Sequence, residues 1–183
     1  MQDGLVTDLS KEGYNYIMLD VDGVLISHRY TDYERKQGIY DKRVGMGIDP
    51  EAVKLLAKIC EECHARIILS ATARKHRWDK PALGNPYSQL VNALSKEGLR
   101  IYDQTPILDS NRPLEVAYWI DMHFPDRGDC NFVVLDDDQE ADKYEALYPG
   151  WAKRTVKTSM KNGMVEHHAN EAINILKRGE KKV

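Results

Sequence analysis

The sequence has few cysteines and no long apolar run, and these two absences exclude several classes of protein. Three of its 183 residues are cysteines, an odd number that argues against the disulfide framework of a small secreted protein. No apolar run approaches the roughly 20 residues that a membrane span needs. The N-terminus lacks the basic start and apolar stretch of a secretory signal. We therefore expect a cytoplasmic protein without membrane contact.

A strong excess of charge of either sign is also missing. The formal net charge is −3, which gives no general attraction to nucleic acid or to an anionic membrane, so any such binding would have to be local. A hydrophobic content of 42% beside 30% charged residues is ordinary for a globular domain. No repeat or linker divides the sequence, and its length suits one domain over residues 1–183.

The string "CEECH", Cys60 to His64, matches the C-x-x-C-H pattern of covalent haem attachment. Two observations argue against a cofactor at this place. The segment has the pattern of the end of an amphipathic helix, and no second Cys/His pair follows at the spacing of a zinc site. We interpret the cysteines as buried residues on one helix face.

Short apolar runs alternate with amphipathic stretches along the chain. This alternation predicts right-handed crossovers and a mainly parallel five-stranded sheet, hence a Rossmann-like three-layer α/β sandwich. The predicted strands are 15–20, 65–70 and 131–136, with 99–103 and 152–158 as weaker candidates. The predicted helices are 49–63, 86–98, 111–124 and 165–179, with a further short helix after the acidic run at 136–138.

The three clearest strands end in polar residues. Asp20, Ser70 and Asp136 are the last residues of these strands. In open α/β sheets ligands bind beyond the carboxyl ends of the strands, so all three side chains are expected at one edge of the sheet.

Asp20 and Asp22 follow the first strand one residue apart, and Gly23 allows a sharp turn behind them. Such a pair of carboxylates is able to cap the next helix, to bind a cation, or to divide a reaction between a nucleophile and an acid/base. The pair alone does not decide between these roles.

A second acidic group, Asp136 to Asp138, follows a strand that should lie near the first. Gathering so much negative charge without a cation is costly, because like charges in partly dry surroundings repel each other. Carboxylate oxygens in an open arrangement suit Mg²⁺, which keeps several waters and leaves a position for a phosphate. A solvated acidic turn is the alternative, and it suits Asp138 better than Asp136.

Three polar side chains are candidates for holding a phosphoryl group. Ser70 offers a hydroxyl, and Arg74 offers a guanidinium that can bind phosphate in a bidentate way. Arg112 stands just before Pro113, a favoured first helical residue, in a loop that opens at the same edge. Lys143, on the short helix after the acidic run, is the alternative to Arg112 as the cation of the site.

These motifs, in this order, resemble those of the haloacid-dehalogenase-like (HAD) phosphohydrolases. "LDVDGVL" is similar to their first motif, "ILSATAR" to the second, Arg112 to the basic third and "VVLDDD" to the acidic fourth. The resemblance extends from about Tyr14 to Leu176. Within the superfamily, "SATAR", "RPLEVAYWI" and "TSMKNGM" look most like the small HAD domains of Swiss Army Knife RNA-repair-like proteins, and more distantly like polynucleotide 3′-phosphatase domains.

The resemblance implies a phosphatase that forms an aspartyl-phosphate. Asp20 would attack phosphorus as a carboxylate that is already ionised at neutral pH. Asp22 would protonate the leaving oxygen and later deprotonate water. Ser70 and Arg112 would stabilise the charge on the phosphoryl oxygens.

The resemblance also implies Mg²⁺ as the cofactor. Asp20, the backbone carbonyl of Asp22, and Asp136 would hold the ion, with Asp137 as a direct or indirect ligand. Which of Asp136, Asp137 and Asp138 bind the metal directly is left open by the sequence.

The segment 26–48, which we call the flap segment, is where many relatives insert a cap domain. Here it is too short for a cap with its own core. An open site favours a large substrate such as an RNA or DNA end. The flap segment interleaves basic and aromatic residues suited to a nucleic-acid strand, although acidic residues dilute its charge: Arg29, Tyr30, Tyr33, Arg35, Lys36, Tyr40, Lys42 and Arg43.

Two other functions remain open from the sequence. A phosphatase for a nucleotide or sugar phosphate would use the same residues with a different flap. A non-catalytic phosphate-binding module would use the same sheet, although it would be better served by fewer anions. The oligomeric state is not predicted.

His167 and His168 are adjacent, so on a helix their side chains diverge by about 100° and are poorly placed to share a metal ion. We interpret them as surface or helix-start residues.

Overall fold

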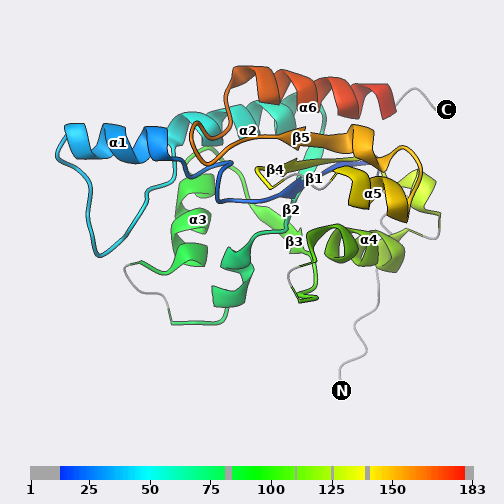
Figure 1. Ribbon diagram of the computed structural model, residues 1–183, viewed down its shortest axis with the longest axis horizontal. Coiled ribbons are helices and arrows are strands. Elements are labelled where there is room, and N and C mark those ends of the chain that lie inside the picture. Colours follow the sequence, from blue (N-terminus) through cyan, green and yellow to red (C-terminus); the bar gives the residue numbers. More distant parts are fainter. Residues whose placement is uncertain (1–12, 81–83, 110, 125, 139–140, 180–183) are drawn as a thin grey trace.

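The chain forms a parallel sheet of five strands with helices on both faces (Figure 1). This computed structural model describes residues 13–80, 84–109, 111–124, 126–138 and 141–179. The strands are β1 (Asn15–Leu19), β2 (Ala65–Leu69), β3 (Ile101–Gln104), β4 (Phe132–Asp136) and β5 (Thr155–Lys157). Their order across the sheet is β3-β2-β1-β4-β5.

The helices follow the strands in alternation, as the sequence predicted, and polar residues begin several of them. Asp49 accepts a hydrogen bond from the N–H of Glu51, and Asn111 accepts one from the N–H of Leu114, so both act as N-caps. The α-helices are α1 (His28–Lys36), α2 (Pro50–Glu62), α3 (Pro86–Ser95), α4 (Arg112–His123), α5 (Ala141–Leu147) and α6 (Glu166–Gly179).

Two apolar clusters hold the layers together. The helices α2, α3 and α6 pack on one face of the sheet, where Leu19 and Leu69 point, and α4 and α5 cover the other, where Tyr16 and Met18 point. Alternate residues of β1 therefore enter different cores, and its five residues are all buried. The predicted three-layer α/β sandwich is confirmed.

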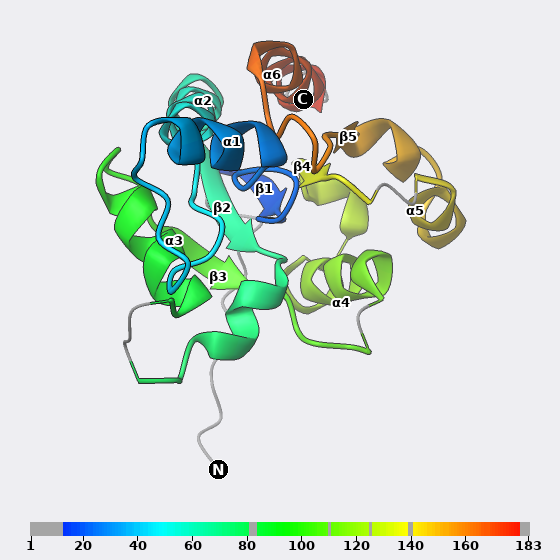
Figure 2. The ribbon, with the colours of Figure 1, turned by 60° about the vertical axis from the view of Figure 1, so that its left-hand side comes forward.

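The strand order positions the site. From β1 the chain moves to β2 and β3 on one side and then returns to β4 on the other. The order thus reverses between β1 and β4, and such a switch point opens a crevice at the carboxyl ends of the two strands. Figure 2 is turned by 60° from the view of Figure 1 and shows β1 and β4 side by side at the centre of the sheet.

Two segments differ from the sequence prediction. The predicted strand 152–158 is only half a strand, because a 3₁₀-helix occupies Trp151–Arg154 before β5 begins at Thr155. Trp151 is buried against Phe132, so packing of the ring overrides the extended pattern.

The flap segment contains the helix α1, which Ser27 caps by accepting a hydrogen bond from the N–H of Tyr30. No cap domain is present among the described residues of the segment.

The remaining fold-level expectations concern the cysteines and the N-terminus. Cys60 and Cys63 lie at the end of α2 outside any disulfide bond, and burial raises the pKa of the Cys60 thiol to about 12. Such thiols are poor ligands and poor nucleophiles, as the buried-helix interpretation requires.

The N-terminal stretch assessed for a signal lies outside the described residues. No helix in the described part of the chain has the length and apolar character needed to cross a membrane.

Candidate active site

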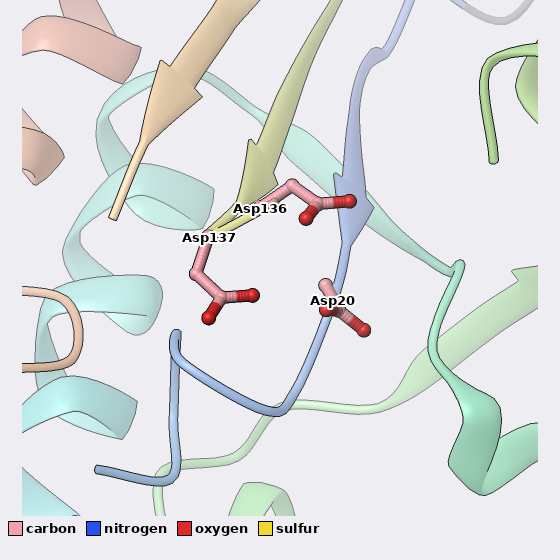
Figure 3. Close-up of side chains that lie close together, drawn as sticks. All are labelled: Asp20, Asp136 and Asp137. Carbon is pink, nitrogen blue, oxygen red and sulfur yellow. The ribbon is translucent and has the colours of Figure 1, made fainter. Parts of the chain in front are cut away.

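Three carboxyl groups meet at the switch point of the sheet (Figure 3). Asp20 directly follows β1, Asp136 ends β4, and Asp137 follows it. Each offers a ligand oxygen, and these oxygens all lie within 4.8 Å of one another. The two strand ends are tied together, since the N–H of Asp20 donates to the carbonyl of Leu135 across the β1–β4 pair. Pairing of the strands thus forces the acidic residues together.

The carboxyl groups are held away from water, and this changes their ionisation. Burial is the main cause that raises the pKa of Asp20 to about 7, and the charges of Asp136 and Asp22 add to it. Burial likewise raises the pKa values of Asp136 and Asp137. Without a cation Asp20 is therefore only partly ionised near neutral pH, whereas the sequence led us to expect full ionisation, because the folded structure disfavours the anion.

Arg112, the first residue of α4, faces this cluster. Its guanidinium lies 3.4 Å from Asp20 Oδ1 and 3.7 Å from Asp136 Oδ2, and it donates to the Ser70 hydroxyl at 3.4 Å. These separations are longer than the 2.7–2.9 Å of a tight charge-assisted bond, and the side chain is 22% exposed. Arg112 is therefore near enough to balance the acidic charge and loose enough to turn toward an anion.

Asp137 joins three loops at the site. Its carboxylate accepts a hydrogen bond from the backbone N–H of Met160, in the loop after β5. The carbonyl of Met160 in turn accepts the N–H of His28 at the start of α1. On its other side Asp137 fills the space beside Gly23, where an added Cβ would lie 2.2 Å from the Asp137 Cγ. Gly23 also has a φ of +72°, so glycine is required here for both conformation and space.

The other predicted carboxylates lie at the margin. Asp22 is exposed in the turn after β1, but it lies within electrostatic reach of Asp20 and Asp137, whose pKa values its charge raises. Asp138 is exposed, and its backbone N–H donates to Asp136 Oδ1 at 2.9 Å, as in an acidic turn. Lys143 is exposed on α5. The structure thus brings Arg112, rather than Lys143, to the acidic cluster.

Ser70 reaches the site only through its hydroxyl. Its backbone N–H donates to the carbonyl of Leu19 at 2.8 Å, and the residue is 1% exposed. The hydroxyl faces Arg112. The predicted pair of Ser70 and Arg112 is therefore present at the sheet edge, with Asp20 beside the same guanidinium.

Arg74 is not available in the way the sequence predicted. Its guanidinium is buried and donates to Glu115 Oε2 at 2.5 Å, to the carbonyl of Ala71 at 2.9 Å and to that of Pro106 at 3.3 Å. Burial also lowers its pKa, although Glu115 opposes this shift. An arginine whose two terminal nitrogens bond to protein oxygens has no free fork for a phosphate. We therefore correct the phosphate-binding assignment of Arg74.

The partner of Arg74 is a residue that sequence reasoning missed. Glu115 is 1% exposed on α4, three residues after Arg112, and its Oε1 accepts the N–H of Leu108. Through Leu108, Glu115 binds the loop between β3 and α4. Through Arg74, it binds the segment after β2. Both segments are thus attached to the first turn of α4. A glutamate on the buried side of an amphipathic helix was the available signal, because a buried charge requires a partner. The pair holds the start of α4, and with it Arg112, against the sheet edge.

The donor set fits a divalent cation. Three carboxylates on one side supply hard oxygen ligands, and oxygens on opposite sides of Mg²⁺ are separated by about 4.2 Å. The 4.8 Å spread of the ligand atoms exceeds this only slightly. Asp20, Asp136 and Asp137 are therefore the side chains that would hold the ion. A cation there would also offset the unfavourable ionisation of these three acids, of which Asp20 and Asp136 are buried.

The histidine pair plays a structural part. His168 is buried rather than exposed, and its Nδ1 accepts the N–H of Val165 at 3.1 Å. It therefore caps the start of α6 in the manner of a capping box. Of the two interpretations from the sequence, the helix-start one is confirmed for His168, while His167 is the exposed member.

The fold and the acidic switch point are those expected of a HAD-like α/β domain. More specifically, the family model for the HAD domain in Swiss Army Knife RNA repair proteins matches residues 16–169, and the chain belongs to this family. Comparisons with curated proteins and with solved structures gave no match. Membership indicates phosphohydrolase chemistry in general terms, and Mg²⁺ is the typical cofactor of HAD proteins.

Substituting Gly23 tests the packing around Asp137. We expect Gly23→Ala to weaken Mg²⁺ binding by roughly tenfold or more, because the new methyl group displaces a ligand carboxylate. Titration calorimetry with MgCl₂ measures the change. Gly38→Ala is the matched control, since Gly38 has φ +69° but nothing within 4 Å of an added Cβ. The control should lose about 1 kcal/mol of stability through strain and keep its affinity. Equal losses in both variants would contradict the steric argument.

The raised acid pKa values predict a pH-dependent effect of Mg²⁺ on stability. Since the pKa of Asp20 is about 7 in the folded protein against an ordinary value of 3.8, the folded form binds more protons than the unfolded form between these values. Without a cation its stability therefore falls as pH rises through this window, by up to roughly 4 kcal/mol. Mg²⁺ should then raise the melting temperature by several degrees at about pH 8 and hardly at all at about pH 5.

Thermal unfolding with MgCl₂ or EDTA measures this effect. Asp20→Asn removes the carboxyl with the largest shift, so its apo form should lose most of the pH dependence. An Mg²⁺ effect that is equal at both pH values would argue against metal binding by these acids.

The Arg74–Glu115 pair is tested by a double-mutant cycle. Arg74→Met and Glu115→Leu should each lower the free energy of unfolding by about 3 kcal/mol or more, because each leaves a buried charge unpaired. The double variant Arg74→Met/Glu115→Leu should be less destabilised than the sum. Its kcat toward p-nitrophenyl phosphate should still fall roughly tenfold or more, since Arg112 is no longer held in place. Wild-type kcat in the double variant would show that the pair serves stability alone.

Proposed function

We propose that the protein is a Mg²⁺-dependent phosphomonoester hydrolase that acts through an aspartyl-phosphate on Asp20. The observation that carries the proposal is the convergence of three carboxylates at the switch point, two of them buried and the third half-buried, with the guanidinium of Arg112 facing them. A site built only to bind phosphate gains nothing from three acids, because they repel the ligand. Acids are useful where one attacks phosphorus and the others hold a cation.

In the first step a carboxylate oxygen of Asp20 forms a bond to phosphorus while the bond between phosphorus and the leaving oxygen breaks. Asp22 gives a proton to that leaving oxygen. Asp20 suits attack because the backbone after β1 fixes it near the crevice, where the N–H of Asp20 is held by Leu135. Asp22 suits proton transfer because its exposed carboxyl lies in the adjoining turn and can exchange protons with water.

In the second step water attacks the phosphorus of the aspartyl-phosphate, Asp22 accepts the proton, and inorganic phosphate leaves with Asp20 restored. Ser70 and Arg112 stabilise the negative charge on the phosphoryl oxygens in both steps. Asp20, Asp136 and Asp137 would hold Mg²⁺, which would supply positive charge that screens the attacking carboxylate from the anionic phosphate. Because burial raises the pKa of Asp20 to about 7, positive charge beside it would favour its ionisation near neutral pH.

We further propose that the substrate phosphate is at the end of a nucleic-acid strand. The cavity beside Arg112 and Asp136 has a volume of about 10 Å³, which is too small to enclose a substrate as typical small-molecule pockets do. A larger pocket of about 460 Å³ lies between α1 and the start of α2. The residues that line it do not include Asp20, Asp136 or Asp137. The family match to domains of RNA repair proteins supports the same substrate class.

The substrate proposal is tested with a panel of phosphate esters. Mg²⁺-dependent hydrolysis of p-nitrophenyl phosphate that EDTA abolishes tests the chemistry. A 3′-phosphorylated oligonucleotide should then be preferred to mononucleotides, with steep inhibition by salt. Preference for a nucleotide or sugar phosphate would favour the small-molecule alternative. Absence of turnover on every ester would favour a phosphate-binding module.

Asp20→Asn tests the nucleophile. We expect this variant to lose detectable hydrolysis of p-nitrophenyl phosphate while its circular dichroism and cooperative unfolding are retained, because an amide oxygen is a poor nucleophile in a nearly isosteric side chain. Asp142→Asn on the exposed first turn of α5 is the matched control and should keep full activity. Retained turnover in Asp20→Asn would exclude Asp20 as the attacking group.

A further inference from the structure

One aromatic residue near the site is exposed without a packing role. Trp78 is 83% exposed, whereas Trp119 and Trp151 are each 2% exposed. It lies eight residues after Ser70, in the segment that leaves β2 at the carboxyl edge (Figure 2). An exposed tryptophan is unusual, because its large apolar surface is normally buried. Its exposure near a phosphate site points to a ligand with flat rings.

Three cations lie on the same segment as this ring. The guanidinium carbon of Arg77 lies 4.8 Å from the centre of the Trp78 ring, so one face of the ring is covered and the other is open. Lys75 and Lys80 are exposed on the same segment. Within the described part of the chain these three cations have no ion pair, while the acidic Asp79 is bound to His76 Nδ1 at 2.8 Å. The segment thus presents unneutralised positive charge beside an aromatic face.

The segment is anchored rather than loose at its base. The N–H of Arg77 donates to the carbonyl of Arg74, whose guanidinium is itself buried, and Asn85 Nδ2 donates to the carbonyl of His76. The ring is therefore carried on a backbone that is fixed to β2 and to the start of α3. A pre-formed aromatic platform loses little entropy when a base stacks on it.

The flap segment is a poorer candidate in the structure than in the sequence. Its arginines are paired with acidic neighbours, Arg29 with Asp49 and Arg43 with Asp41. Its aromatic rings are also occupied, since Tyr30 stacks on Tyr33. A nucleic-acid strand would have to break these ion pairs and this ring stacking before it could contact the arginines and tyrosines of the flap segment. The most exposed aromatic ring, Trp78, lies instead on the segment after β2, beside three cations.

We propose that residues 75–80 form a platform for single-stranded nucleic acid, with one base stacked on the open face of Trp78 and the backbone phosphates held by Lys75, Arg77 and Lys80. This inference rests on the proposed function, because the strand's terminal phosphate would enter the site at Asp20. The 3₁₀-helix Thr72–His76 lies between Ser70 and Trp78, and its five residues extend about 10 Å. A strand of about four nucleotides or more is therefore needed to reach both places, within the usual range for such surfaces.

Tryptophan fluorescence reports on this contact directly, because the other two tryptophans are buried. The Asp20→Asn protein, which should not hydrolyse the probe, is titrated with a 3′-phosphorylated oligoribonucleotide of about ten nucleotides. We expect saturable quenching, and a 5- to 100-fold loss of affinity in Asp20→Asn/Trp78→Ala measured by fluorescence anisotropy of a labelled strand. Inorganic polyphosphate, which cannot stack, should bind both proteins equally.

Three controls separate the possible outcomes. Trp78→Ala alone should hydrolyse p-nitrophenyl phosphate at the wild-type rate, while losing its preference for oligonucleotides over mononucleotides. Lys75→Ala and Lys80→Ala should each lower the slope of log affinity against log salt by roughly one. Lys42→Ala, on the flap segment, should have a smaller effect on binding.

Equal strand affinity with and without Trp78, or absence of quenching, would overturn the platform, and a protein partner would then be the explanation for the exposed ring. If quenching occurs but no phosphate ester is hydrolysed by the wild-type protein, the platform stands and the proposed hydrolase function fails.

Discussion

The electrostatic repulsion among three clustered carboxylates, two buried and one half-buried, is the constraint around which the site is organised. Asp20, Asp136 and Asp137 come together because β1 and β4 pair in parallel and end at the same level. Sheet pairing and core packing supply the free energy that holds them there. The raised pKa values of the three acids reflect the cost of ionising them in this position. Arg112 relieves part of the repulsion, and a divalent cation would relieve the rest.

The supporting residues are explained by the same constraint. Gly23 leaves room for Asp137, and the N–H of Met160 binds its carboxylate. The buried pair of Arg74 and Glu115 fixes the first turn of α4, which carries Arg112. Each of these contacts determines where a charge stands relative to the acidic cluster. A change of one supporting residue is therefore expected to affect metal binding or turnover through position rather than through chemistry.

An open edge distinguishes this site from enclosed ones. The flap segment holds one helix in place of a cap domain, and its charged and aromatic side chains largely pair with one another. On the proposed function, access would be decided by the segment after β2, where Trp78 and three cations face solvent. The chemistry of the cluster and the proposed choice of substrate would in this way reside on different loops of one sheet edge, a common division in α/β proteins.

The sequence determined the alternation of strands and helices, the identity of the acidic strand ends and the helix caps, because each depends on local pattern and on residues close in the chain. Tertiary structure decided the roles of Arg74 and Glu115, which lie 41 residues apart. A guanidinium after a strand is equally suited to phosphate and to a buried carboxylate, and only the folded chain shows which partner it meets. The pKa of Asp20 and the exposure of Trp78 likewise depend on burial, which is set by distant segments packing together.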